Sequence, residues 1–256
     1  MKDFSLRAYR FYLKLLIQSD AQFLTFEQYI QSDKASLERF VVLRHDVDRK
    51  PENALAMANV EAELGVCATY YFRLSTLNRR VIKSIKELGH EVGFHYESLS
   101  DADGDFEEAY KLFVSGLKKF NGLTKVKTIS MHGRPLKPYD NRDLWKTVKG
   151  KKLLNELGIL GEIYLCIDYK DIAYVNDTGR NWESNRSNRR DKVNSQVNAD
   201  FISQDELIDF FKSPHPQIVF QVHPERWSDS NVEWTLQLLK DSVINSAKII
   251  LTFLGR

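Results

Sequence analysis

The sequence predicts an α/β fold, in which a parallel sheet carries helices on its outside and is closed or nearly closed into a barrel. Short runs rich in β-branched and aromatic residues alternate along the chain with longer stretches of helical periodicity. The 256 residues contain no internal repeat, low-complexity tract or Pro/Gly/Ser linker, and α/β barrels often reach this length as one domain. We therefore expect a single domain over residues 1–256, with an N-terminal helical extension over 1–39 and the barrel over 40–256.

The first two thirds of the chain show this alternation most clearly. Helical periodicity is expected over residues 5–17 and again, more briefly, over 24–31. The predicted strands lie at 41–47, 67–73, 90–95 and 126–131. A predicted helix follows each of them, near 52–64, 77–88, 105–120 and 141–148. Such an alternation is typical of parallel strands joined by helical connections.

The last third is less regular before it returns to the same pattern. Its predicted elements are short strands at 160–167 and 171–176, a helix near 204–212 and a strand at 217–222. A polar loop runs from Asp177 to about Asn198. Ser230 and Glu233 form a capping box that opens the final helix. The apolar residues of that helix recur on one face, at Val232, Leu236, Leu239 and Val243.

The composition excludes several functional classes. Lys plus Arg number 37 against 35 for Asp plus Glu, and this balance argues against a protein that binds nucleic acid in bulk. The basic stretch 186–192 is expected to be a solvated loop. The two cysteines, Cys67 and Cys166, lack metal-ligand spacing, so we expect reduced thiols in a cytoplasmic chain. The N-terminal stretch does not resemble a signal peptide, and no run approaches the roughly 18 apolar residues of a membrane span.

Polar side chains gather where the predicted strands end. The first strand runs from an apolar segment directly into Arg44, His45, Asp46 and Asp48. The later strand ends carry, in chain order, Arg73, His95 with Glu97, His132 with Arg134, Asp177 and His223. Because the carboxyl ends of parallel strands open on one face, these side chains should meet there. His90 and His215 lie at strand starts and are expected to be structural or solvated.

This gathering of imidazoles and carboxylates favours a metal site or an acid/base site. Each residue taken alone is more often a hydrogen-bonded structural group, and one of the aspartates could simply cap the helix that Pro51 opens. Several such groups on one rim, without basic partners in equal number, favour a functional site over a set of separate structural roles. Oxygen and imidazole ligands without a thiolate suit zinc or another first-row divalent ion. If the site holds a metal, these donors therefore predict a divalent ion, with zinc as the expected metal.

Four strings of the sequence resemble a known family. They are VLRHDVDRKPENAL, GVCATYYFR, LGHEVGFHYES and FQVHPERW, and they look like motifs of the polysaccharide deacetylases, the NodB-homology or carbohydrate esterase family 4 group. The resemblance covers residues 40 to 227, and its most specific element is GHEVGFH after an Asp-x-Asp strand. It implies a distorted (β/α) barrel, a single divalent metal and the hydrolysis of N-acetyl or O-acetyl groups on sugars.

The resemblance also implies roles for individual residues. Asp46 matches the catalytic base of the family, and Asp48 matches its metal-binding aspartate. His95 matches the first metal histidine, and His223 stands where the family places its catalytic acid. Arg134, which precedes a proline, is similar to the arginine that braces the base in the family's third motif.

The sequence departs from the family pattern at several places. Leu99 occupies the position of the second metal histidine, four residues after His95. Gln221 stands where the last motif usually has leucine, and no clear Asp-x-x-Asp-Trp motif is present, although Trp182 follows an acidic stretch. These departures leave open a catalytically inactive barrel that has kept a sugar-binding groove.

The missing metal ligand has three candidate replacements. A catalytic zinc usually takes three protein ligands, and Asp48 and His95 supply two; Glu97, His45 and His132 are available for the third. His45 should point to the opposite side of its strand from the base, and the direction of Glu97 in its turn cannot be read from sequence. His132 ends the strand beside that of His95 if the strand order is sequential. We therefore predict Asp48, His95 and His132 as the ligands.

The remaining polar residues of the rim are predicted to bind substrate. They are Arg73, Glu97, Asp177, Arg180 and Trp182. In the loop 177–182, Arg180 offers a donor fork and Trp182 a stacking face, so this loop is expected to cover the substrate; the alternative is an ordinary surface loop.

The predicted function is a metal-dependent hydrolase that removes an acyl group, N-acetyl or O-acetyl, from a sugar-containing substrate. The expected partners are an acylated sugar, a nucleotide-sugar or a lipid-linked glycan, with no nucleic acid and no transmembrane segment. The rival functions are the inactive sugar-binding barrel and a metal-dependent amidohydrolase that acts on a non-sugar amide.

Overall fold

A computed structural model describes residues 1–134, 137–183, 191–213 and 217–253, with the side chains only up to residue 245. Residue 135, which completes the Arg-Pro pair, His215 and most of the basic stretch 186–192 lie outside these residues. Among the described residues, no helix has the length and apolar character that crossing a membrane requires.

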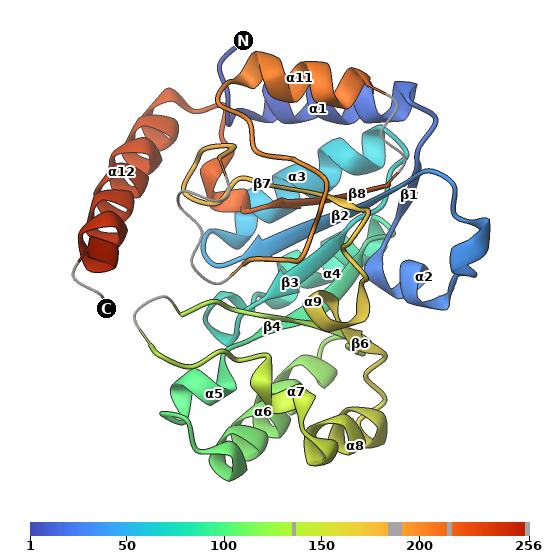
Figure 1. The fold of residues 1–256 in the computed structure, drawn as a ribbon, viewed down its shortest axis with the longest axis vertical. Coiled ribbons are helices and arrows are strands. Elements are labelled where there is room, and N and C mark those ends of the chain that lie inside the picture. The colour runs from blue at the N-terminus through green and yellow to red at the C-terminus, as the bar shows by residue number, and fades with distance from the viewer. Residues whose placement is uncertain (135–136, 184–190, 214–216, 254–256) are drawn as a thin grey trace.

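A parallel sheet forms the centre of the fold (Figure 1). Its strands are β1 (Gln22–Leu24), β2 (Phe40–Val47), β3 (Thr69–Phe72), β4 (Glu91–Tyr96), β5 (Thr128–Met131), β6 (Gly161–Glu162), β7 (Ala173–Asn176) and β8 (Gln217–Val222). They follow the order β6-β5-β4-β3-β2-β8-β7, with β1 paired to the start of β2. Every pairing is parallel. No pairing joins β6 to β7 within the described chain, so the sheet curls into an open, distorted (β/α) barrel, as predicted.

Helices cover the outside of this sheet (Figure 1). They are α1 (Leu6–Gln18), α2 (Phe26–Gln31), α3 (Pro51–Glu63), α4 (Arg79–Glu87), α5 (Ser98–Asp101), α6 (Phe106–Asn121), α7 (Asp143–Lys146), α8 (Val148–Glu156), α9 (Ile163–Cys166), α11 (Gln204–Lys212) and α12 (Asn231–Phe253). Short 3-10 turns lie at Lys34–Ser36, Leu74–Thr76 and Pro224–Arg226. Helix α1 lies beside α11, whereas α12 extends away from the body (Figure 1).

Strand β2 shows how the alternation of side chains builds the site. Arg44 and Asp46 point into the barrel, where Arg44 lies in register with Gln221 of β8. His45, between them, points outward and contacts Glu61 of α3. All of these side chains are buried. The expectation that His45 faces away from the base is therefore confirmed, because successive side chains of a strand lie on opposite faces.

The structure differs from the predicted elements in three places. Residues 22–24 form a strand that was not predicted, between the two expected helices and overlapping only the first residue of the second, and 141–148 form one short helix and the start of a second. The predicted strand at 160–167 is only the two residues of β6 followed by α9. The cause is Glu162, whose carboxylate accepts hydrogen bonds from the backbone N–H groups of Tyr164 (2.9 Å) and Leu165 (3.0 Å) and so caps a helix.

Candidate functional site

Five predicted site residues meet at the carboxyl end of the barrel strands. Asp46 lies in β2 and Asp48 just after it, His95 lies in β4, His132 follows β5 and His223 follows β8. Because these strands are parallel, their carboxyl ends all reach the same rim. His95 Nε2 lies 3.6 Å from Asp46 Oδ2 and 3.5 Å from Asp48 Oδ1, so the carboxylates and the imidazole form one cluster.

Asp46 is held by a dense set of donors. Arg44 binds it with two parallel hydrogen bonds, Nε to Oδ1 at 2.9 Å and Nη2 to Oδ2 at 2.7 Å. Gln221 Nε2 donates to Oδ2 at 2.7 Å. Burial raises the pKa of Asp46, but the charge of Arg44 outweighs it, and the net pKa lies below its usual value. Asp46 is therefore a rigid, ionised carboxylate inside the barrel.

The arginine that braces Asp46 is Arg44, whereas the resemblance assigned this role to Arg134. Arg134 instead lies at the outer rim, with Nη1 at 3.4 Å from Glu97 Oε2 and Nη2 at 3.4 Å from Asp101 Oδ1. The reason is local: Arg44 lies two residues before Asp46 and on the same strand face, so its guanidinium reaches the carboxylate directly. Strand alternation could have revealed this pair, and the family motif concealed it.

The tautomers of His95 and His132 follow from their hydrogen bonds. Nδ1 of His95 lies 3.0 Å from the carbonyl oxygen of Ser130, and Nδ1 of His132 lies 2.6 Å from Glu97 Oε2. A carbonyl and a carboxylate only accept, so both Nδ1 atoms donate. In the neutral rings, Nε2 then carries a free lone pair. Burial lowers the pKa of His95 below its usual value, which favours its neutral form.

Both free Nε2 atoms face the same carboxylate oxygen. Asp48 Oδ1 lies 3.5 Å from His95 Nε2 and 3.6 Å from His132 Nε2. It is buried and has no hydrogen-bond partner among the described residues. An orphaned buried oxygen of this kind costs free energy unless something occupies the space in front of it.

The three predicted ligands do not form a closed metal cluster. In the part of the chain that the structure covers, no three or more His, Cys, Asp or Glu side chains lie close enough together to hold a metal ion as they stand. The ring centroids of His95 and His132 are 5.2 Å apart, edge to face. Two ligands of one tetrahedral zinc ion lie about 3.4 Å apart for bonds of about 2.1 Å. The two oxygen-to-nitrogen distances at Asp48, 3.5 Å and 3.6 Å, match this spacing closely.

Glu97 supports His132 and does not stand free at the rim. Its carboxylate accepts from His132 Nδ1 and from Arg73 Nη2, each at 2.6 Å. Burial raises the pKa of Glu97, but its bonds to His132 and Arg73 outweigh this and lower the pKa to about 2. Glu97 and Arg73, both predicted to bind substrate, are therefore bound to each other. A carboxylate on the distal nitrogen of a histidine fixes the ring and raises its basicity as a ligand.

His223 is oriented by Asp177. Its Nδ1 donates to Asp177 Oδ1 at 2.6 Å, and its backbone N–H donates to Oδ2 at 3.0 Å. Asp177 also accepts from Arg226 Nη1 (2.9 Å) and Trp227 Nε1 (2.8 Å). Burial lowers the pKa of His223, but the carboxylate outweighs it and the net pKa is raised. Asp177, predicted to bind substrate, is thus a positioning residue that leaves Nε2 of His223 able to carry a proton.

The Asp177 cluster should make stability depend on acid pH. Burial raises the pKa of Asp177, but Arg226 and His223 together lower it to about 2. A carboxylate whose pKa is lower in the folded than in the unfolded state stabilises the fold at pH values above its unfolded pKa. This contribution is lost as the pH falls through the folded-state pKa. We expect Asp177→Asn to lower the free energy of unfolding by about 2–3 kcal/mol at pH 7, and by about half as much at pH 3. Urea unfolding of both proteins at the two pH values measures this, and an equal difference at both would contradict it.

The loop 177–182 packs into the protein and does not cover a substrate. Trp182 is only 4% exposed and stacks on Phe4 with ring centroids 5.2 Å apart, while its Nε1 donates to Asp3 at 2.7 Å. The guanidinium of Arg180 lies 4.5 Å from the ring centre of Trp234. Both predicted substrate contacts are thus buried core residues. Their partners come from the two distant ends of the chain, which is why sequence proximity to the site was misleading.

Substitution of Trp182 separates these two roles. We expect Trp182→Ala to lower the free energy of unfolding by about 3–5 kcal/mol, as for other buried tryptophans. Because Trp182 packs on Phe4 and bonds Asp3, KM for the acyl-sugar substrate that the sequence predicts should stay unchanged in the folded fraction. Chemical unfolding and steady-state kinetics measure the two effects. A raised KM with a normal free energy of unfolding would instead show that Trp182 contacts the substrate.

Two histidines lie outside the site, behind the sheet. Nε2 of His45 lies 2.6 Å from Glu61 Oε1, which also accepts from Tyr9 at 2.5 Å. His90 bonds the backbone of Ala58 and Ala68 through its two ring nitrogens. The expectation that His90 is structural is therefore confirmed.

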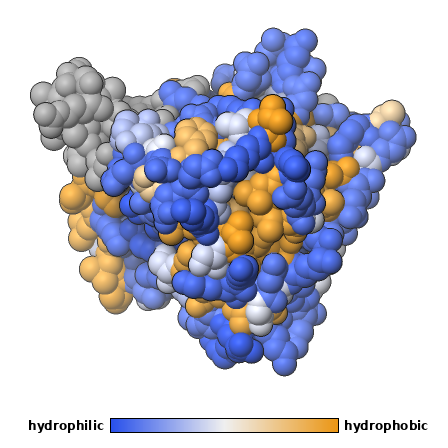
Figure 2. Space-filling view, turned by 90° about the horizontal axis from the view of Figure 1, so that it is seen from below, coloured by the Kyte–Doolittle hydropathy of each residue, from blue (hydrophilic) through white to orange (hydrophobic). Residues whose placement is uncertain are grey.

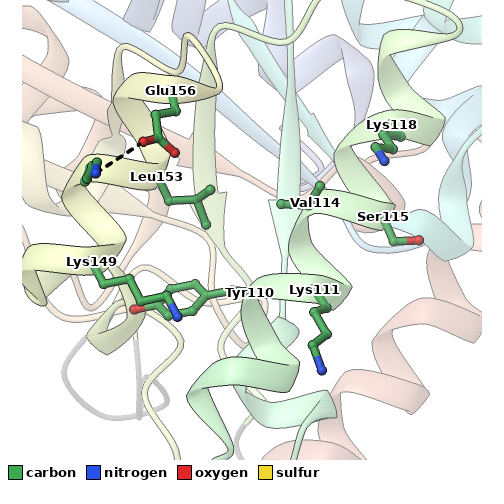
Figure 3. Close-up of a pocket in the computed structure, with 9 residues that line it drawn as sticks. Tyr110, Lys111, Val114, Ser115, Lys118, Lys149, Leu153 and Glu156 are labelled. Atoms are coloured by element: carbon green, nitrogen blue, oxygen red, sulfur yellow. Dashed lines mark ion pairs between the residues drawn. The ribbon is translucent and has the colours of Figure 1, made fainter.

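A separate cavity of about 560 Å³ lies between α6 and α8 (Figure 3). Leu153 and Val114 form its apolar part, Lys149 lies beside Tyr110, and the remaining side chains are mostly charged. None of the predicted site residues lines it. Its lysines are exposed, and two of them, Lys111 and Lys152, pair with glutamates of their own helices, so solvent screens their charge.

Comparisons with known proteins concern the fold. No family model and no curated sequence matches the chain. Among solved structures, it is similar to a CE4 family pseudoenzyme from Bacillus anthracis, at 14% identity and a TM-score of 0.47 over 80% of this chain. The match covers 60% of the pseudoenzyme, so the chain spans less than two thirds of that protein's length.

Two further solved structures are similar over a greater share of their length. One is a Streptococcus mutans CE4 esterase, at 17% identity and a TM-score of 0.47 over 90% of each chain. The other is a polysaccharide deacetylase from Bacillus cereus, at 16% identity and a TM-score of 0.43 over 81% of this chain and 89% of that one. These likenesses are of fold alone.

Proposed function

We propose that the chain is a metal-dependent hydrolase that removes an acyl group, N-acetyl or O-acetyl, from a sugar-containing substrate. The observation that carries the proposal is the buried, unpartnered Asp48 Oδ1 with two imidazole Nε2 atoms within 3.6 Å and an ionised carboxylate, Asp46, beside them. A structural role alone does not account for an orphaned oxygen at the mouth of the barrel.

Asp48, His95 and His132 would hold the divalent ion, with zinc as the expected metal. One carboxylate and two imidazoles form a usual donor set for catalytic zinc, which keeps a fourth position open. Each imidazole is already fixed through Nδ1 by an acceptor, Ser130 or Glu97. When bound, the ion would supply Lewis-acid polarisation of the acyl carbonyl and activation of water.

The chain's own residues would move the protons. Asp46, kept ionised by Arg44, accepts the proton of the attacking water as a general base. His223, held by Asp177, carries a proton on Nε2 in its charged form and delivers it to the leaving amine or alkoxide. The raised pKa of His223, caused by the Asp177 carboxylate, favours this charged form.

The proposal is tested by acetate release from the purified chain reconstituted with zinc. The substrates are acetylated monosaccharides and oligosaccharides, nucleotide-linked acetylsugars, lipid-linked acetylated glycans and acetylated non-sugar amides. We expect release from one of the sugar classes together with one bound ion per chain. Release from the non-sugar amides alone would favour an amidohydrolase, and a chain that binds no stoichiometric ion and releases no acetate would be the inactive barrel.

A further inference from the structure

Helix α12 turns its polar side toward the body of the protein. Nε1 of Trp234 donates to the backbone carbonyl of Asp3 at 2.7 Å, and Nδ2 of Asn245 donates to that of Gly179 at 2.7 Å. Asp241, between them on the same side, is buried. These contacts, one in the first turn and one about three turns further along, fix the rotation of the helix about its axis.

The opposite side of α12 is apolar and faces solvent. Its residues are Val232 at 70% exposure, Leu236 at 62%, Leu239 at 59% and Val243 at 70%. The helix stands apart from the barrel (Figure 1), and apolar surface appears at the corresponding edge of the molecule (Figure 2). An amphipathic helix normally buries its apolar face and exposes its polar one, so the arrangement here is inverted. A contiguous exposed stripe of this kind marks an interaction surface.

The spacing of the stripe identifies the kind of partner. The intervals of four, three and four residues between Val232, Leu236, Leu239 and Val243 are those of the a and d positions of a coiled coil. One flank of the stripe carries Glu233 and Lys240, one helical heptad apart. The Glu233 carboxylate also accepts from Ser228 Oγ at 2.8 Å and lies 3.7 Å from Lys50 Nζ, but its side chain is still 46% exposed. The other flank carries the small polar residues Thr235 and Ser242. Another helix with apolar residues at the same intervals and complementary flanking charges would fit this surface.

We propose that the partner is a second copy of this chain, with the two α12 helices packed antiparallel about a two-fold axis. The register that sets Leu236 against Leu239 of the second copy also sets Val232 against Val243. In an antiparallel coiled coil with that register, the flanking e positions meet, so Glu233 faces Lys240 of the second copy and Lys240 faces its Glu233. The contact is therefore self-complementary in shape and in charge, as a two-fold interface requires.

Two other arrangements fit the side chains less well. In a parallel pair, the e position meets the g position of the partner, so Lys240 would face Thr235 and no charges would pair. A helix that lies on a membrane surface needs a polar face rich in Lys and Arg. Between residues 231 and 245, α12 has only Lys240 against Glu233 and Asp241, and this composition does not favour anionic lipid.

The first test measures the mass of the full chain by sedimentation equilibrium over a range of concentrations. We expect a reversible dimer of the wild-type chain. Leu236→Asp should raise the dimer dissociation constant at least about thirtyfold, as for a central hot-spot residue. Val148→Asp is the matched control, since Val148 is an exposed apolar residue at the start of another helix, and it should leave the dimer intact. Circular dichroism should show unchanged helix content in both variants.

The second test uses the charge pairs to establish the register. Lys240→Glu alone should weaken self-association about tenfold, because like charges then meet. Glu233→Lys alone should do the same. Its free energy of unfolding is measured as well, because this substitution also removes the contacts of Glu233 with Ser228 and Lys50. An equimolar mixture of the two variants should form a heterodimer as tightly as the wild-type chain associates, since every pair is again complementary.

Three outcomes would overturn the proposal. They are a wild-type chain that stays monomeric at all concentrations, a dimer unaffected by Leu236→Asp, and a mixture of charge variants that associates no better than either alone. A monomer that sediments with vesicles of mixed neutral and anionic lipid would assign the stripe to a membrane instead.

Discussion

Asp46→Asn is expected to lower kcat by about 10²–10⁴-fold, the usual contribution of a general base. Asparagine keeps the size and one acceptor of the side chain, so the barrel and the proposed ligands Asp48 and His95 should stay in place. Bound zinc, measured by elemental analysis, should therefore remain at one ion per chain. Turnover near the wild-type level would remove Asp46 from the mechanism.

The same substitution should also destabilise the protein, because Asp46 neutralises Arg44 in the barrel interior. Both side chains are essentially inaccessible to solvent, and loss of one member of a buried ion pair costs about 3–5 kcal/mol. The double variant Arg44→Met/Asp46→Asn removes the uncompensated charge as well. It should recover part of the free energy of unfolding and none of the turnover, which separates the structural from the chemical role of Asp46.

The strand and helix order was predictable because each element carries its own periodic signal. Strand β2 and helix α6 show this. The eight residues of β2 and the amphipathic stripe of α6 each have a local hydrophobic pattern, and that pattern alone predicts the element. Strand β1 escaped prediction because three residues, Gln22–Leu24, are too short to show a period. It forms because Gln22 to Leu24 lie in register with the start of β2, and such a pairing between distant segments leaves no trace in either segment alone.

The site was predictable in its composition and less so in its contacts. Strand ends on one rim are a consequence of parallel topology, so Asp46 and His95 meet as expected. Which partner each side chain selects depends on sheet curvature and side-chain reach. Glu97 shows this, since it binds Arg73 and His132 from two neighbouring strand ends. No spacing in the sequence encodes that choice.

The helix α12 shows a different limit of sequence analysis. Its apolar stripe was correctly predicted to share one face, yet a helical period does not say which way that face points. The polar anchors Trp234 and Asn245 decide the orientation through backbone carbonyls on other segments.

His132→Ala is expected to lose metal and activity together. Two proposed ligands, Asp48 and His95, would remain, and catalytic zinc usually requires three. Zinc affinity, measured by competition with a chelator on the purified protein, should fall by far more than the 10–100-fold that loss of a supporting contact causes. Because His132 is partly exposed at the rim, the fold should survive the substitution.

Glu97→Ala also tests whether His132 binds the metal, because Glu97 contacts His132 and is not itself a proposed ligand. It removes the acceptor that holds Nδ1 of His132 at 2.6 Å, so the ion should still bind, about 10–100-fold more weakly. Asp101→Asn is the matched control, since Asp101 lies near Arg134 on the same rim and has no contact with His132 among the described hydrogen bonds and ion pairs; it should leave the affinity unchanged. A His132→Ala protein that binds one ion with undiminished affinity would exclude His132 as a ligand. In that case, equal affinities of the Glu97→Ala and wild-type proteins would place the ion elsewhere on the rim.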